Sequence, residues 1–297
     1  MATRRQFGLG FGAAIAAGTV AWRARAAQAD PWPEALGRQF AAIEARCGGR
    51  LGVGVLDTGT GRTAGHRGHE RFPMCSTHKA LSAAAVLARV DRGEDRLDRR
   101  VRFGAGDVLS YSPGTKAHAG GDGMALAAIC EAAVTLSDNT AANLMLDAIG
   151  GPAGLTAFLR GLGDADTRLD RTEPGLNEAL PGDPRDTTSP WAMAVDLDRL
   201  VLGQALSPAS RDRLAAWLVA CKTGDARLRA GVPPGWRVGD KTGTGERGTA
   251  NDVGVLWPPG RAPVVVAAFI TGSDAPPDAQ SAAIAEVART VVLALEA

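Results

Sequence analysis

The chain has 297 residues, 45% of them hydrophobic, and carries 33 basic against 32 acidic side chains, for a net charge of +1. This is enough apolar chain for a full core and one or two domains. The near-neutral charge, without any basic run among aromatic residues, argues against nucleic-acid binding and against attraction to an anionic membrane.

The N-terminus has the pattern of an export signal. Arg4 and Arg5 precede an apolar run over 7–22, and small residues at 27–29 offer a cleavage site. This pattern is typical of a twin-arginine signal peptide, which we expect to comprise residues 1–29. A membrane anchor is the alternative, but the apolar run is shorter than the roughly 20 residues that a spanning helix needs. We therefore expect export to the periplasm or the medium.

Hydrophobic periodicity predicts the elements that follow. Strands are expected at 50–58, 61–68, 236–243, 249–258 and 262–272. Helices are expected at 31–46, 79–92, 125–134, 140–149, 152–162, 191–202, 208–221 and 278–296.

This order predicts an α/β (α+β) protein with one antiparallel sheet built from both chain ends and covered by the terminal helices. The α/β lobe would comprise residues 30–65 and 222–297, and an all-helical lobe residues 66–221. A cleft between two such lobes is a usual place for a ligand.

The helical lobe contains a long loop, 168–186, that fits neither helix nor strand. Its segment "RTEPGLNEALPGDPRD" (171–186) holds three prolines and two glycines, which break either pattern. Structureless loops of this length are usually functional or disordered. Glu173, next to Pro174, is its candidate functional residue.

Three short motifs carry candidate chemistry. Ser76 and Lys79 lie three residues apart at the start of a helix, so a nucleophile and an amine share one face. Alone, this pair could be a helix cap and a solvated lysine. It is followed by Ser-Asp-Asn at 137–139 and Lys-Thr-Gly at 241–243, which could separately be a cap and a turn. Together, in this order, they match the motifs of penicillin-recognising serine enzymes.

The chain resembles the class A serine β-lactamases over nearly its whole mature length. The matching blocks are "RFPMCSTHK", "YSPGTKAH", "SDNTAANLMLDAIGG", "DRTEPGLNEALPGDPRDTTSP", "GDKTGTGERGTANDVGVLWPPGR" and the C-terminal helix. The resemblance implies a five-stranded antiparallel sheet with flanking helices beside a helical lobe. It also implies hydrolysis of penicillins and cephalosporins and hence antibiotic resistance, with no cofactor or metal, in a monomer.

The resemblance assigns catalytic roles residue by residue. Ser76 matches the acylated nucleophile, Lys79 its proton-transfer partner, and Ser137 the relay to the leaving lactam nitrogen. Glu173 with Asn177 matches the pair that holds the deacylating water. Whether the lysine or the glutamate activates the serine is disputed for this family, and the sequence leaves it open.

Further residues are assigned to substrate binding. Asn139 matches a donor to the substrate side-chain amide, Lys241 a source of positive potential for the substrate carboxylate, and Tyr111 a wall of the cleft. The oxyanion hole would comprise the backbone N–H groups of Ser76 and Thr244. Thr242 and Gly243 complete the predicted binding strand.

The chain departs from common family patterns at a few positions. Ala250 stands where many members have an arginine that helps to hold the carboxylate; Arg227 matches the replacement arginine of some relatives, and the alternative is a solvated surface residue. Cys75 resembles a cysteine that carbapenem-hydrolysing members bridge to a partner, but Gly245 occupies the partner position. His78, inside the serine-lysine motif, is interpreted as a packing residue.

The four cysteines and four histidines have no metal-binding spacing, so a metallo-β-lactamase is excluded and no disulfide is predicted. Within the loop, the resemblance implies a cis Glu173-Pro174 bond and an ion pair between Arg171 and Asp186 at its neck. The alternative functions are a penicillin-binding peptidase, a β-lactam sensor and a carboxylesterase. The loop with Glu173 argues against a peptidase, and the pair of Ser-Asp-Asn and Lys-Thr-Gly motifs argues against a carboxylesterase. No partner domain supports a sensor.

Overall fold

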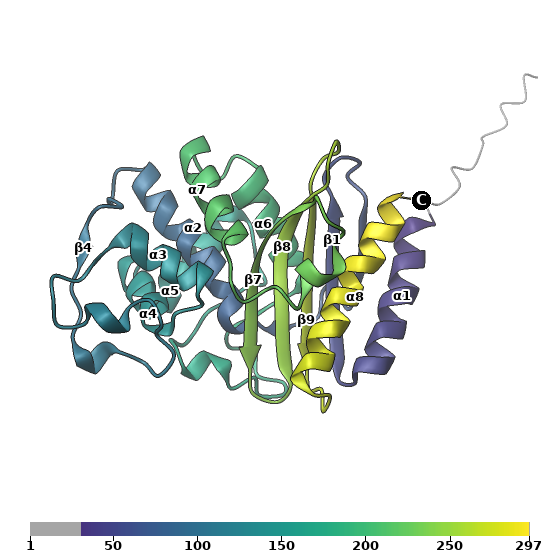
Figure 1. Ribbon diagram of the computed structural model, residues 1–297, viewed down its shortest axis with the longest axis horizontal. Helices are drawn as coiled ribbons and strands as arrows, with labels where there is room; N and C mark the ends of the chain where they lie inside the picture. The colour runs from purple at the N-terminus through teal and green to yellow at the C-terminus, as the bar shows by residue number, and fades with distance from the viewer. Residues whose placement is uncertain (1–30, 297) are drawn as a thin grey trace, which may run out of the picture. The chain divides into compact units, whose positions relative to one another are not determined.

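The computed structural model describes residues 31–296, so the predicted signal peptide, 1–29, lies outside the described residues. Five strands form one antiparallel sheet in the order β2-β1-β9-β8-β7 (Figure 1). Its strands are β1 (Arg50–Asp57), β2 (Thr63–His66), β7 (Arg237–Gly245), β8 (Thr249–Trp257) and β9 (Val264–Thr271). The five predicted strands and the predicted α+β class are therefore confirmed.

The helices agree closely with the predicted ones. They are α1 (Trp32–Cys47), α2 (His78–Asp91), α3 (Leu126–Thr135), α4 (Asn139–Ala148), α5 (Gly151–Leu162), α6 (Pro190–Leu197), α7 (Pro208–Val219) and α8 (Pro277–Glu296). The predicted helix over 191–202 differs at its end, because a π-helical turn, Asp198–Leu202, follows α6. None of the helices within 31–296 is long and apolar enough to cross a membrane.

Short elements join the long ones. Two small antiparallel pairs are β3 (Phe72–Pro73) with β6 (Thr187–Thr188) and β4 (Arg100–Val101) with β5 (Met124–Ala125). Single 3₁₀ turns occupy Cys75–Thr77, Ala105–Asp107, Lys116–His118, Gly175–Asn177 and Leu228–Gly231.

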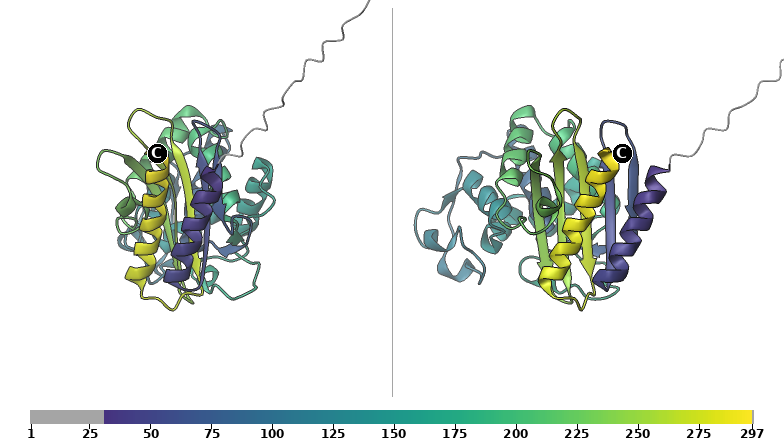
Figure 2. Two further views of the ribbon diagram at one scale, coloured as in Figure 1. Left: turned by 90° about the vertical axis from the view of Figure 1, so that its right-hand side faces the viewer. Right: turned by 45° about the vertical axis from the view of Figure 1, so that its right-hand side comes forward.

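The sheet separates two apolar cores. Helices α1 and α8 lie side by side against one face, and the remaining helices lie on the other side (Figures 1 and 2). Strand β9 contributes side chains to both cores. Val266 and Ile270 pack in the core under α1 and α8, whereas Val265 and Phe269 pack in the core on the opposite face, under the remaining helices. A strand buried on both faces needs such a continuous apolar run.

The topology brings the predicted site together. The β3–β6 pair places the end of the long loop beside the segment that enters the Ser76 turn, with Phe72 opposite Thr188. Strand β7, which carries the Lys-Thr-Gly motif, is one of the two edge strands of this sheet and packs against that turn. The predicted lobe boundaries stay a prediction.

Candidate active site

Ser76 occupies the 3₁₀ turn that leads directly into α2, where the helix dipole favours negative charge. The preceding residue, Cys75, has a φ of +47°, in the left-handed region that non-glycine residues seldom adopt. Ser76 Oγ donates to Glu173 Oε1 at 3.4 Å, and the serine is 9% exposed. The turn thus holds a nearly buried hydroxyl at the mouth of α2, next to a carboxylate.

Lys79 lies in the first turn of α2, three residues after Ser76, and is fully buried. Its Nζ donates to the Ser137 carbonyl at 2.9 Å and to Asn139 Oδ1 at 2.6 Å, and lies 2.9 Å from Glu173 Oε1. Burial lowers the pKa of Lys79, although Glu173 beside it opposes the shift. The lysine is thereby closer to the neutral form that a proton acceptor requires.

Ser137 lies between two lysines. Lys241 Nζ donates to Ser137 Oγ at 3.1 Å, and Lys79 Nζ lies 3.5 Å from the same oxygen. Ser137 has a φ of +58°, and Asp138 after it caps α4 by accepting the N–H of Ala141. Burial lowers the pKa of Lys241 to about 8, with repulsion from Lys79 in the same direction. A hydroxyl between two amines is placed to pass a proton.

Glu173 is held on both carboxylate oxygens and on its backbone. Asn177 Nδ2 donates to Oε2 at 2.5 Å, while the side chain of Asn143 accepts the Glu173 N–H and donates to its carbonyl. Burial would raise the pKa of Glu173, but His78 and Lys79 beside it lower the value to about 2. The glutamate is therefore an anion at neutral pH, and the Glu173-Pro174 bond is cis, as the resemblance implied.

The neck of the loop is closed at Asp186. Its Oδ1 accepts the backbone N–H groups of Asp170 and Arg171, and its Oδ2 accepts Arg171 Nε at 2.5 Å. The Asp186 side chain is 1% exposed and that of Arg171 20%. The structure therefore contains the ion pair at the loop's neck, and it is largely buried.

Ser76 and Ser137 open onto one small cleft of about 280 Å³, and Lys79, Glu173 and Lys241 lie buried behind them. Its lining consists of Ser76, Tyr111, Ser137, Asn139, Asn177, Thr223, Arg227, Thr242 and Thr244. Gly243 lies against the nucleophile's turn, where an added Cβ would be 2.7 Å from the Met74 carbonyl, so only glycine allows this approach. The structure thus brings all the predicted site residues to one region.

Arg227 belongs to the cleft and is half-buried, which rules out the solvated surface alternative. Its Nη1 donates to the carbonyls of Gly243 and Asn251, and its Nη2 donates to Thr244 Oγ1 at 2.8 Å. Ala250 pairs with Thr244 across the strands, so the guanidinium lies beside the position where an arginine is missing. Arg227 brings a second cation to the Lys-Thr-Gly strand.

Three residues of the site were missed or misread from sequence. Thr223 Oγ1 shares a hydrogen bond of 2.5 Å with Thr242 Oγ1 and lines the cleft, but no motif marks it. Asn143 could have been found, since it lies four residues after Asn139 on the same helix face. His78 was interpreted as packing only, yet its ring lies against Glu173.

The cysteines do not form part of the reacting cluster. Burial raises the pKa of the Cys75 thiol to about 12, and an added Cβ at Gly245 would lie 2.6 Å from its Sγ. In the described part of the chain, no group of three or more histidine, cysteine or acidic side chains is arranged to hold a metal ion.

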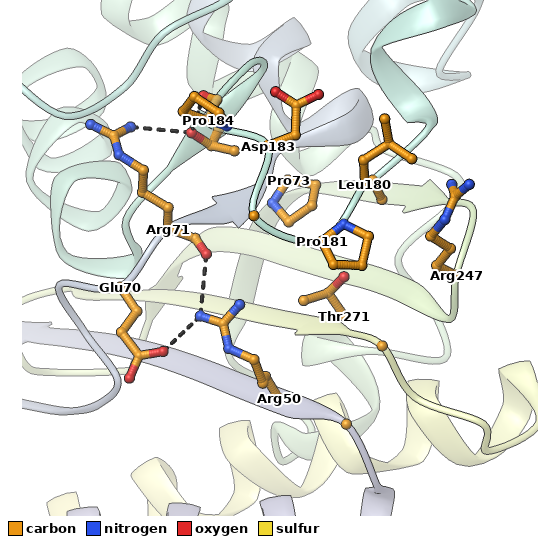
Figure 3. A pocket seen from close by; sticks show the side chains of 15 residues that line it. Arg50, Glu70, Arg71, Pro73, Leu180, Pro181, Asp183, Pro184, Arg247 and Thr271 are labelled. Atoms are coloured by element: carbon orange, nitrogen blue, oxygen red, sulfur yellow. Dashed lines mark hydrogen bonds and ion pairs between the residues drawn. The ribbon is translucent and has the colours of Figure 1, made fainter.

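A second hollow, of about 660 Å³, lies beside the later part of the loop, where residues 179–184 line it (Figure 3). Leu180, Pro181 and Arg247 form part of its wall, and Arg50 bonds Glu70 across its floor. It contains none of the predicted catalytic or substrate-binding residues. The smaller cleft is therefore the candidate active site, because Ser76 and Ser137, which line it, contact Glu173, Lys79 and Lys241.

Comparison with known proteins gives a consistent result. A profile of the β-lactamase enzyme family matches residues 35–295. The chain is 49% identical over 257 residues to the β-lactamase AST-1 of Nocardia asteroides, covering 86% of this chain and 83% of that protein. It is 50% identical over 251 residues to the β-lactamase L2 of Stenotrophomonas maltophilia, covering 84% and 82%. A solved ancestral class A β-lactamase, GNCA, is 66% identical with a TM-score of 0.86, covering 87% of this chain and 99% of that one.

Proposed function

Because the chain belongs to the class A β-lactamases, enzymes that hydrolyse β-lactams and confer resistance to them, we propose that it opens penicillins and cephalosporins through an ester on Ser76. One observation carries this proposal. Ser76 Oγ and Lys79 Nζ converge on a single oxygen, Glu173 Oε1, at 3.4 and 2.9 Å. A nucleophile, an amine of lowered pKa and a carboxylate in one buried cluster are the parts that acyl transfer requires.

In the acylation step, the coupled Lys79–Glu173 pair accepts the proton of Ser76 as its Oγ attacks the lactam carbonyl carbon. The negative charge that develops on the carbonyl oxygen is stabilised by the N–H groups of Ser76 and Thr244. Each such donor contributes about 3 kcal/mol to the transition state. Thr244 lies on edge strand β7, whose outer side pairs with no other strand of the described part of the chain.

The ring then opens. The C–N bond breaks, the nitrogen takes a proton from Ser137, and Ser137 is reprotonated from the lysines that contact its Oγ. Lys79 and Lys241 lie 3.5 and 3.1 Å from that oxygen. The product of this step is an ester between Ser76 and the opened substrate.

Deacylation uses Glu173. The carboxylate removes a proton from a water molecule, whose oxygen attacks the ester carbonyl carbon, and Ser76 leaves with a proton returned from the cluster. Asn177 supports this role, since its Nδ2 bonds Glu173 and its buried Oδ1 has no hydrogen-bond partner among residues 31–296, so it can accept from the water. Overall, one water is added across the lactam C–N bond.

Two cations serve substrate binding. Arg227 lines the cleft and Lys241 is buried beneath it, and with the hydroxyls of Thr242 and Thr244 they would hold the substrate carboxylate. Asn139 would donate to the side-chain amide, and Tyr111, 52% exposed, would form the outer wall. Export through the twin-arginine signal, a monomeric state and the two-lobe division of the chain also belong to this proposal.

Steady-state hydrolysis of a chromogenic cephalosporin by Ser76→Ala tests the proposal. We expect loss of at least about 10³-fold in kcat with substrate binding retained. Hydrolysis by the variant at the parent's rate would exclude Ser76 as nucleophile. Acylation of the parent without turnover would favour the peptidase or sensor alternatives instead.

A further inference from the structure

His78 directly precedes Lys79 in the Ser76–Lys79 motif, and its ring lies against the Glu173 carboxylate. It is 0% exposed, and its Nε2 lies 3.8 Å from Glu173 Oε1, longer than a hydrogen bond. Among the described residues, Nε2 has no hydrogen-bond partner. A buried polar atom without a partner is unusual in a folded protein and calls for a physical explanation.

The other ring nitrogen determines which atom carries the proton. His78 Nδ1 lies 3.2 Å from the hydroxyl of Ser82, one turn further along α2. If Nδ1 held the proton, the lone pair of Nε2 would face an anionic oxygen. If Ser82 donates to Nδ1, the proton is on Nε2 and the N–H dipole points at Glu173, which is favourable.

We propose that His78 is a positioning residue for Glu173: a neutral imidazole, fixed by Ser82 in the Nε2–H form, that holds the carboxylate ionised and in place for deacylation. This inference rests on the proposed role of Glu173. It assigns a part in deacylation to His78, for which the sequence motifs predict only a packing role.

The contact between His78 and Glu173 would matter during the reaction, when the charge of Lys79 changes. Lys79 is the ammonium partner of Glu173, at 2.9 Å, but Lys79 also has to exchange protons during acylation and ring opening. Whenever the lysine is neutral, Glu173 loses its charged partner. The N–H dipole of a neutral ring, whose proton does not take part in the reaction, keeps the carboxylate oriented throughout the cycle.

The charged surroundings support a neutral ring. Glu173 on the loop favours the imidazolium, whereas Lys79 on α2 and Lys241 on β7 oppose it, and burial, the largest effect, lowers the pKa of His78. Glu173 itself faces His78 and Lys79, with the Cys75 thiol also near. A neutral ring with a proton on Nε2 is the form that fits all of these neighbours.

Two substitutions at one position test the proposal. His78→Phe keeps the ring's bulk but removes the donor, and His78→Gln keeps an amide N–H at a similar reach. The measurement is the pH dependence of the deacylation rate constant, taken from pre-formed acyl-enzyme. We expect the acid limb of His78→Phe to lie about one pH unit or more above the parent's, since Glu173 loses the N–H dipole that favours its charged form. We expect His78→Gln to stay near the parent. Coinciding limbs for His78→Phe and the parent, or equal shifts in both variants, would overturn the proposal.

Ser82→Ala supplies a matched control through a double-mutant cycle. Ser82 acts only by fixing the ring, so Ser82→Ala should shift the acid limb in the parent but not in the His78→Phe background. Additive shifts would show that the two side chains act separately. Should the phenylalanine variant fail to fold, ¹⁵N imidazole shifts of the parent decide, because they report whether the His78 proton is on Nε2, as proposed, or on Nδ1.

Glu173→Gln separates failure of this inference from failure of the proposed function. If Glu173→Gln accumulates acyl-enzyme while His78→Phe keeps the parent's acid limb, only the role of His78 is wrong. If Glu173→Gln does not accumulate acyl-enzyme, the proposed deacylation itself is wrong.

Discussion

Asp186→Ala perturbs the neck of the catalytic loop without touching the cleft. The substitution leaves three donors without their acceptor: the backbone N–H groups of Asp170 and Arg171, and the Nε–H of Arg171, whose side chain is 20% exposed. At about 1 kcal/mol for each donor, the loss is about 3 kcal/mol of unfolding free energy. For a chain of this size, this corresponds to a fall in Tm of about 6–12 °C. The φ of +57° at position 186 disfavours alanine further.

Thermal melts and single-turnover deacylation measure this effect. We expect Asp186→Ala to lower both the Tm and the deacylation rate, because Glu173 depends on the loop for its position. Glu178→Ala is the control, because Glu178 is the other partner of Arg171. The Glu178 side chain is 46% exposed, so its removal should lower the unfolding free energy by less than about 1 kcal/mol. Equal effects of the two substitutions, or an unchanged Tm for Asp186→Ala, would refute the claim that burial gives the pair its strength.

Three further predictions concern the cleft. Arg227→Ala should raise the KM for penicillins about tenfold with little change in kcat, as one charge-assisted contact is lost; an unchanged KM would remove Arg227 from carboxylate binding. Gly245→Ala should slow deacylation, because the added Cβ would lie 2.6 Å from Cys75 Sγ and 2.8 Å from the Asn177 carbonyl and would displace Asn177. A deacylation rate equal to the parent's would show that these neighbours move aside without affecting Glu173. The value of kcat/KM should fall above a pH of about 8, where Lys241 loses its proton and its charge. Lys241→Arg should move this alkaline limb to higher pH; an unmoved limb would mean that another group causes it.

The sequence predicted the regular elements well because their physical causes are local. Strand β9 is a continuous apolar run, and α6 and α7 begin with serine caps, Ser189 and Ser207, each followed by proline. These signals lie within a few residues of one another, so periodicity and capping rules can detect them.

The parts that the sequence did not predict depend on contacts between distant segments. Asn143 holds the backbone of Glu173 across thirty residues, and Thr223 meets Thr242 across nineteen. His78 lies inside the serine-lysine motif, but the sequence predicts only a packing role for it. Its position on α2 is one that a buried apolar residue would also occupy, so the helical pattern does not distinguish the two roles. Only the fold reveals that the loop brings Glu173 to its ring.

Mass spectrometry of Glu173→Gln mixed with a penicillin would detect the proposed ester on Ser76, because its hydrolysis requires Glu173. We expect the intact protein to gain the mass of one whole substrate molecule, the adduct to map to Ser76, and the adduct to persist for many parent turnover times. Turnover by Glu173→Gln at the parent's rate, with no adduct on Ser76, would contradict this proposal.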